Sequence, residues 1–208
     1  MAVISVDLYN PQNQLTPSAN CHTAITGHPA YYSVGVHPWH PDKNLMPKVR
    51  KYAALPSVVA IGETGLDKIT ADTPEGFMLQ QELFLEHIHL SETIGKPLII
   101  HCVKAWDELL HIRKITQPSA PWIIHGFRGK EALAVQLLNT GLYLSFGSFY
   151  NRYALKTAWN RHRLLIETDD KQTNIRDIYQ QIADELQITI HDLSCETGVF
   201  FKTQLLIT

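Results

Sequence analysis

Short apolar runs alternate along the chain with longer segments in which apolar residues recur at helical spacing. The short runs read as buried strands, because they lack the in-and-out alternation of a sheet with one wet face. Seven such strands are predicted, at Val3–Asp7, Tyr32–His37, Val58–Glu63, Leu98–Cys102, Trp122–Phe127, Leu142–Phe146 and Leu164–Asp169. Helices are predicted between them, at Pro41–Tyr52, Glu75–Ile94, Ala105–Lys114, Lys130–Asn139, Tyr153–Asn160 and Ile175–Leu186, with a last one after Asp192. Strict alternation of strand and helix indicates a parallel sheet covered by helices.

Residues that can bind a metal close five of these runs at their carboxyl ends. They are His37, Glu63, His101, His125 and Asp169. In an open sheet, functional groups gather at one or two strands, whereas in a closed barrel the carboxyl ends of many strands meet around one axis. The pattern therefore predicts an α/β fold, a TIM-type (β/α)8 barrel, as a single domain over residues 1–208. Because seven strands are found where eight are needed, we expect an incomplete or distorted barrel that lacks its first strand.

Glu63, His101, His125 and Asp169 combine two carboxylates with two imidazoles. This mixed set suits Zn²⁺, Mn²⁺, Ni²⁺ or Fe²⁺, and an ion bound there lowers the pKa of a bound water until it can act as a nucleophile. Burying any of these groups without a partner is costly, so a shared cation is the simplest explanation for all four. As a single residue, a histidine at a strand end is more often structural.

The residues beside these ends have roles that the sequence leaves open. His37 is expected either to bind a substrate phosphate or to cap its strand. Lys104 and Arg128 are expected either to clamp a phosphate or to remain solvated loop charges. Asp67 is expected to form an Asx-type turn or a helix cap and not to bind metal. Cys102 is expected to be a buried, inert thiol. Neighbouring side chains on a strand point to opposite faces, so Cys102 points away from the site if His101 points toward it.

Composition narrows the classes of function. The 208 residues are 45% hydrophobic, enough for a large core, and 18 basic residues balance 20 acidic ones without a basic stripe. Nucleic-acid binding would therefore have to come from a site and not from net charge. Three cysteines without a C-x-x-C pair favour a reducing compartment, and no segment approaches the ~20 apolar residues of a membrane span. We expect a cytoplasmic protein with no membrane contact.

Six segments, in this order, resemble the TatD-like deoxyribonucleases of the metal-dependent hydrolase superfamily. They are SVGVHPW, AIGETGLD, the helix that carries Gln80, Gln81 and Phe84, KPLIIHCVKAWDEL, IIHGFRG and LLIETDD. The resemblance covers residues 30–187. It implies a (β/α)8 barrel that hydrolyses phosphodiester bonds, commonly as a 3′ to 5′ nuclease on DNA. It also implies a divalent metal cofactor (Zn, Mg, Mn or Ni), one or two ions per chain, and DNA or a small phosphoester as substrate.

The resemblance further assigns roles to the four candidate ligands. Glu63 would bridge two metals, and His101 and His125 would hold the second one. Asp169 would bind the first metal and take the proton from the attacking water. On this basis Glu63 and Asp169 are the candidate catalytic residues.

The N-terminal strand departs from the family pattern. Family members begin with Asp-x-His-x-His or His-x-His, which supplies two imidazoles to the first metal, and Met1–Leu15 has neither pattern. His22 and His28 cannot replace it, because two imidazoles on one strand face need a spacing of two. Either the true start lies upstream, or we expect a weakened first metal site, impaired hydrolysis and a homodimer through the exposed sheet edge. The alternative function is a catalytically degenerate barrel with a structural or partner-binding role.

Overall fold

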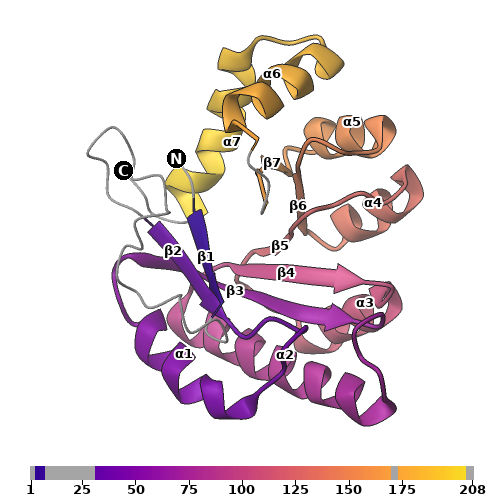
Figure 1. Ribbon diagram of the computed structural model, residues 1–208. Coiled ribbons are helices and arrows are strands. Elements are labelled where there is room, and N and C mark those ends of the chain that lie inside the picture. The colour runs from indigo at the N-terminus through magenta and orange to yellow at the C-terminus, as the bar shows by residue number, and fades with distance from the viewer. Residues whose placement is uncertain (1–2, 8–30, 170–172, 205–208) are drawn as a thin grey trace. The chain divides into compact units, whose positions relative to one another are not determined.

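The computed structural model describes residues 3–7, 31–169 and 173–204, in which strands and helices alternate as predicted (Figure 1). The strands are β1 (Val3–Asp7), β2 (Tyr31–Gly35), β3 (Val58–Asp67), β4 (Leu98–Val103), β5 (Trp122–Ile124), β6 (Tyr143–Phe146) and β7 (Leu164–Ile166). The helices are η1 (Lys43–Leu45), α1 (Met46–Ala53), α2 (Pro74–Ile94), α3 (Trp106–Thr116), α4 (Glu131–Asn139), α5 (Arg152–Asn160), α6 (Ile175–Leu186) and α7 (Ile190–Gln204). None of the helices in these ranges is long and apolar enough to cross a membrane. The predicted α/β class is confirmed.

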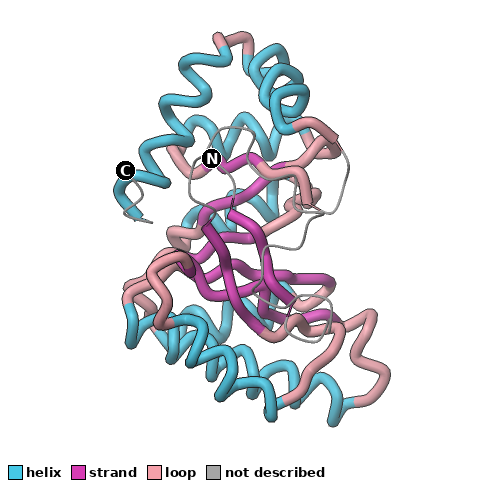
Figure 2. Tube along the Cα trace, turned by 60° about the vertical axis from the view of Figure 1, so that its left-hand side comes forward, coloured by secondary structure: helices cyan, strands magenta, loops and turns pink. Residues whose placement is uncertain are grey.

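The chain forms two compact units, residues 1–120 and 121–208. In the first unit β1, β2, β3 and β4 pair in that order, and each pair is parallel. Helices α1, α2 and α3 lie along one face of these strands (Figures 1 and 2). β1 lies at one end of this set of strands, where an exposed sheet edge is expected. The association of two copies of the chain through that edge stays a prediction. That residues 1–208 form a single domain also stays a prediction.

Helix α2 begins and ends at strong local signals. The Thr73 hydroxyl accepts a hydrogen bond from the backbone N–H of Gly76. Pro74 occupies the first helical position, where proline is favoured because a backbone N–H there would have no partner within the helix. Gly95 ends the helix in the left-handed conformation, with φ of 67°. Between these ends, Leu83 and Phe84 are buried in the core. The helix is thereby fixed along the sheet that carries the candidate ligands.

Strand β3 does not end at Glu63, as the apolar pattern predicts, but continues to Asp67. The residues Thr64–Asp67 pair with Ile100–Val103 of β4, after a shift of register between Ile61 and Thr64. The prediction of the strand end was wrong because glycines within a run are usually signals of a turn. Here they belong to the strand.

Those glycines are needed because β4 approaches β3 closely. At Gly65, with φ of 141°, a Cβ atom would lie 2.0 Å from the carbonyl oxygen of His101. At Gly62, with φ of 128°, it would lie 2.3 Å from the carbonyl oxygen of Ile99. Only glycine fits both the backbone conformation and the space. Gly62 and Gly65 thus relieve the crowding of the two backbones beside Glu63 and His101.

A buried histidine of α2 anchors the end of β2. His87 is fully buried, and its Nε2 accepts a hydrogen bond of 3.0 Å from the backbone N–H of Val36. Its Nδ1 lies 2.7 Å from the carbonyl oxygen of Leu83, so Nδ1 carries the proton of a neutral ring. Burial lowers the pKa of His87 to about 4, against the opposing effect of the Leu83 carbonyl. This neutral ring holds the segment that leads directly into His37.

In the second unit β5, β6 and β7 pair in that order, again in parallel. β5 and β7 are shorter than predicted, so His125 and Asp169 lie beyond the strands that lead to them. Leu137 and Leu155, from α4 and α5, are fully buried, as are Leu144 and Phe146 of β6. Buried side chains from both helices and from β6 thus form an apolar core, and the polar residues that follow β5 and β7 lie outside it.

We predict that His87 makes the first unit sensitive to acid. The unfolded chain binds a proton at this residue below its ordinary pKa of 6.5, whereas the folded chain binds it only near pH 4. The free energy of unfolding therefore falls as the pH drops from 6.5 toward 4, by about 2 kcal/mol at pH 5 from this group alone. Urea unfolding at pH 7.5 and pH 5 measures the loss. His87→Gln, which keeps one donor and one acceptor without a titrating group, should lose clearly less, and an equal loss in both proteins would refute the assignment.

Candidate functional site

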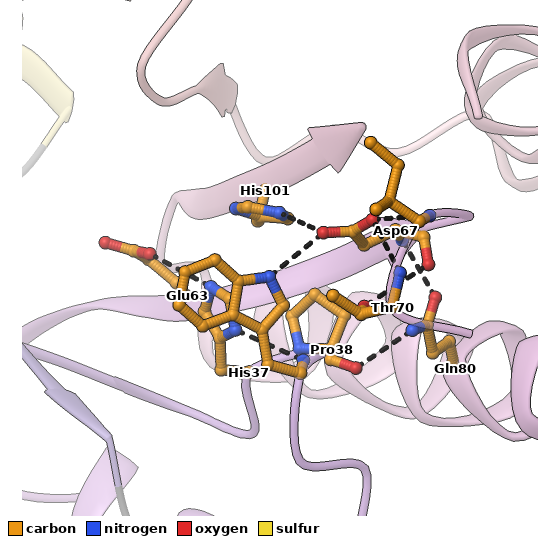
Figure 3. Close-up of polar contacts among 9 residues, drawn as sticks. His37, Pro38, Glu63, Asp67, Thr70, Gln80 and His101 are labelled. Carbon is orange, nitrogen blue, oxygen red and sulfur yellow. Dashed lines mark hydrogen bonds and ion pairs between the residues drawn. The ribbon is translucent and has the colours of Figure 1, made fainter. Parts of the chain in front are cut away.

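His37, Glu63 and His101 form a first cluster of possible metal ligands. One ligand atom from each lies within 4.8 Å of the others. His37 follows the end of β2, Glu63 lies within β3 and His101 lies on β4, so three neighbouring stretches of the sheet contribute (Figure 3). Two imidazole nitrogens and a carboxylate oxygen suit a borderline divalent cation such as Zn²⁺ or Mn²⁺. Glu63 and His101 therefore fit a metal ion, and the hydrogen bonds of His37 decide whether it can be a third ligand.

Asp67 fixes the ring of His101. Its Oδ2 lies 3.0 Å from Nε2 of His101 and accepts a 2.9 Å hydrogen bond from the indole N–H of Trp39. Its Oδ1 accepts hydrogen bonds from the backbone N–H groups of Ile69 and Thr70. Burial alone would raise the pKa of Asp67, but these hydrogen bonds, that of His101 first, outweigh it and hold the pKa below its usual value.

The predicted Asx-type turn at Asp67 is confirmed by these bonds to residues two and three further on. A carboxylate behind a histidine fixes the orientation of the ring and selects which nitrogen faces a metal. Since Nε2 of His101 faces Asp67, an ion bound by His101 would be bound through Nδ1. Asp67 thus orients a candidate ligand.

His37 has the opposite arrangement of donor and acceptor. Its Nδ1 accepts a 3.2 Å hydrogen bond from the backbone N–H of Trp39, which assigns the proton of the neutral ring to Nε2. Nε2 lies 3.5 Å from a carboxylate oxygen of Glu63. A ring that binds an ion through Nε2 must carry its proton on Nδ1, where it would face the Trp39 N–H. The geometry therefore suits a His37 that donates a hydrogen bond better than one that binds metal.

Gln80 of α2 joins the loop after β2 to the end of β3. Its side chain is buried; Nε2 donates to the carbonyl oxygen of Pro38 at 2.9 Å, and Oε1 accepts from the backbone N–H of Asp67 at 2.8 Å (Figure 3). The side-chain amide of Gln80 thus pairs with one backbone group from the loop after β2 and with one from the end of β3. The His37 loop and the Asp67 turn are held in a fixed relation as a result.

His125, Glu167 and Asp169 form a second cluster, within the second unit. Their ligand atoms also lie within 4.8 Å of one another. Glu167 is a residue that the sequence analysis missed: its Oε1 accepts a 2.6 Å hydrogen bond from the backbone N–H of Gly126 and lies 3.3 Å from Nδ1 of His125. Because Glu167 faces Nδ1 of His125, we expect an ion bound by His125 to be bound through Nε2.

A shallow pocket of the second unit adjoins this cluster. It is lined by Gly126, Arg128, Gly147, Ser148, Phe149, Glu167, Thr168 and Asp169. Arg128 therefore lies beside two of the candidate ligands.

Lys104 is an exposed residue with φ of 52° directly after β4, and its role as a phosphate clamp stays a prediction. Cys102 is buried as expected, and burial raises the pKa of its thiol to about 12, which keeps it protonated.

The four ligands predicted to share one cation divide between the two clusters. Glu63 and His101 belong to the first, and His125 and Asp169 to the second. A centre that takes ligands from both clusters stays a prediction, as do the roles assigned to the individual residues. His22 and His28 lie outside the described residues.

The chain is similar in sequence and in structure to known metal-dependent hydrolases and nucleases. The chain matches the TatD related DNase family over residues 3–198. It is similar to the metal-dependent hydrolase YcfH of Escherichia coli strain K12, with 37% identity over 146 residues that cover 66% of this chain and 54% of YcfH. It is 31% identical over 141 residues to the human 3'-5' RNA nuclease TATDN2, covering 62% of this chain and 17% of TATDN2. The crystal structure of YjjV, a TatD homolog from Escherichia coli K12, matches with a TM-score of 0.72 at 20% identity, over 86% of this chain and 78% of that chain.

The chain belongs to the TatD related DNase family, because the match to that family spans almost its whole length. The likeness to YjjV confirms the predicted fold class, an incomplete barrel of the TIM type. The chain spans little more than half the length of the curated metal-dependent hydrolases it matches, 58% and 54% of the first two. Their activities therefore apply to it only as a proposal.

We predict that Asp67→Asn weakens metal binding by about 10-fold or more, the usual effect of removing a carboxylate behind a ligand histidine. The carboxylate of Asp67 now accepts from four N–H groups. The NH₂ group of an asparagine is itself a donor, so it would face one of these N–H groups without forming a hydrogen bond. Titration calorimetry with Mn²⁺ and with Zn²⁺ measures the affinity. Asp72→Asn, an exposed aspartate nearby, is the matched control and should leave it unchanged. Unaltered affinity in a folded Asp67→Asn protein would show that the Asp67 carboxylate does not support a metal site.

Proposed function

We propose that this chain is a metal-dependent hydrolase of phosphodiester bonds that acts on DNA. Membership of the TatD related DNase family and the two clusters of histidines and carboxylates support this proposal. The observation that carries it is the place of Arg128, which lines the same pocket as Glu167 and Asp169. A guanidinium beside carboxylates that can bind metal would bring two positive charges, that of Arg128 and that of the ion, to one anionic group. The guanidinium can bind a phosphate through two parallel hydrogen bonds.

A divalent ion at these clusters would polarise a phosphoryl oxygen and supply a hydroxide at neutral pH. Glu63 and His101 would hold an ion at the first cluster, and His125 and Asp169 would hold one at the second. Asp169 is proposed to accept the proton of the attacking water.

The remaining site residues are proposed to bind the phosphate. His37 suits this role because its Nε2 carries the proton and faces the cluster, where it can donate to a phosphate oxygen. Arg128 would add positive charge at the second cluster. The exposed Lys104 is proposed to do the same directly after β4, in the first unit. We also propose weak turnover, because the sequence of β1, VISVD, contains no histidine that could serve as a ligand. Two-metal hydrolysis needs both ions to clamp the attacking and the leaving oxygen.

We predict slow, metal-dependent hydrolysis of single-stranded DNA. An oligonucleotide labelled at its 5′ end, incubated with Mg²⁺ or Mn²⁺, should be shortened, and a chelator should abolish the reaction until metal is restored. His101→Ala and His125→Ala should each reduce the rate by about 100-fold or more, since each removes a proposed ligand.

His111→Ala is the matched control for these variants. His111 is an exposed histidine of α3 that belongs to neither cluster, so its loss should leave the rate unchanged. Hydrolysis that survives both ligand substitutions would come from another site or from a contaminant. A protein that binds no metal and hydrolyses no phosphodiester would support the alternative, a degenerate barrel with a structural or partner-binding role.

A further inference from the structure

Trp39 presents a large aromatic ring to solvent beside the first cluster. Its side chain is 55% exposed, although its ring centroid lies 4.7 Å from that of His37 and 5.7 Å from that of His101. Both contacts are edge-to-face. A single exposed apolar side chain needs no explanation on most surfaces. This one is different because it is held in place.

Three hydrogen bonds fix the position of Trp39. Its indole N–H donates to Oδ2 of Asp67 at 2.9 Å, and its backbone N–H donates to Nδ1 of His37 at 3.2 Å. The carbonyl oxygen of Pro38, directly before it, accepts from the buried Gln80. Both the polar end of the ring and its backbone are thus tied to the residues that build the site. An aromatic ring already fixed in this way loses little conformational entropy when a ligand contacts it.

The chemistry of the exposed part of the ring restricts what it can bind. The one polar atom of the indole is occupied by Asp67, so the part that remains accessible is an apolar aromatic surface. Such a surface stacks with another planar ring. The adjoining cluster is suited to a phosphate, and a planar ring one nucleotide away from a phosphate is a nucleobase. In a duplex the faces of the bases are covered by their neighbours, whereas in a single strand they are accessible to aromatic side chains.

We propose that Trp39 forms a stacking subsite for one unpaired base of a single-stranded nucleic acid, next to the phosphate held at the first cluster. This inference rests on the proposed function, because it names the part of the substrate that the chain recognises beside the reacting bond. Stacking on an aromatic side chain is tolerant of sequence, since every base has an aromatic face. The subsite therefore selects single strands over duplexes without selecting a base.

The test compares the binding of oligonucleotides that have or lack one base. Fluorescence anisotropy measures the Kd of a phosphorothioate hexathymidylate, which resists hydrolysis, and of six versions with one abasic position each. In the wild-type protein, one abasic position should weaken binding by about 10-fold. Trp39→Ala should raise the Kd of the intact oligomer by a similar factor and remove the dependence on that base. Trp39→Phe, which keeps a stacking ring without the indole N–H, should retain most of the dependence.

Tyr153→Ala is the matched control for loss of an exposed aromatic ring. Tyr153 is 59% exposed on α5 and belongs to neither cluster, so this variant should bind like the wild type. Equal weakening of the intact and all abasic oligomers by Trp39→Ala would overturn the proposal. So would a Trp39→Phe protein as weak as Trp39→Ala, because the role of Trp39 would then lie in its hydrogen bond to Asp67.

Failure of this inference can be told apart from failure of the proposed function. Base-dependent binding without any hydrolysis of a normal oligonucleotide would refute hydrolysis and leave the subsite standing. Hydrolysis that His101→Ala abolishes, together with binding that no single base affects, would refute the subsite alone. A wild-type protein that neither binds nor cleaves the oligonucleotides would refute both.

Discussion

The carboxylate of Asp67 is the constraint on which the arrangement of the first cluster depends. It is almost completely buried, and a buried carboxylate is tolerated only when its oxygens are fully paired. Its partners are Nε2 of His101, the indole of Trp39 and two backbone N–H groups of the following turn. Each pairing fixes something else: the ring of a candidate ligand, an exposed aromatic side chain and the path of the chain after β3. On these contacts Asp67 orients a candidate ligand, and the expectation that it does not itself bind metal stays a prediction.

Close approach of β3 and β4 provides the second constraint. Glu63 and His101 can face one ion only if the backbones of these strands lie near each other, and Gly62 and Gly65 make that approach sterically allowed. The neutral His87 and the amide of Gln80 then secure the neighbouring loop that carries His37. These hydrogen bonds hold the loop of His37 beside the strands that carry Glu63 and His101.

The sequence predicted the order of strands and helices and four candidate ligands, because apolar periodicity and polar strand ends are local signals. It placed the end of β3 wrongly, since a glycine inside a run usually indicates a turn, and the pairing of Thr64–Asp67 with β4 is not local. It missed Glu167, although in the predicted strand Leu164–Asp169 this residue stands two before Asp169, which is the spacing of one strand face. The role of Glu167 arises from its contacts with Gly126 and His125, more than 40 residues away along the chain, which no pattern within one segment contains.

We infer that the residues of these two clusters bind divalent metal ions. Crystals grown or soaked with Mn²⁺ and measured at a wavelength where manganese scatters anomalously would locate any bound ion directly. We expect an anomalous peak within coordination distance of Glu63 and of Nδ1 of His101. A second peak is expected beside Nε2 of His125 if that cluster also binds an ion. Manganese found only elsewhere on the protein, or none at saturating concentration with the side chains well ordered, would contradict this inference.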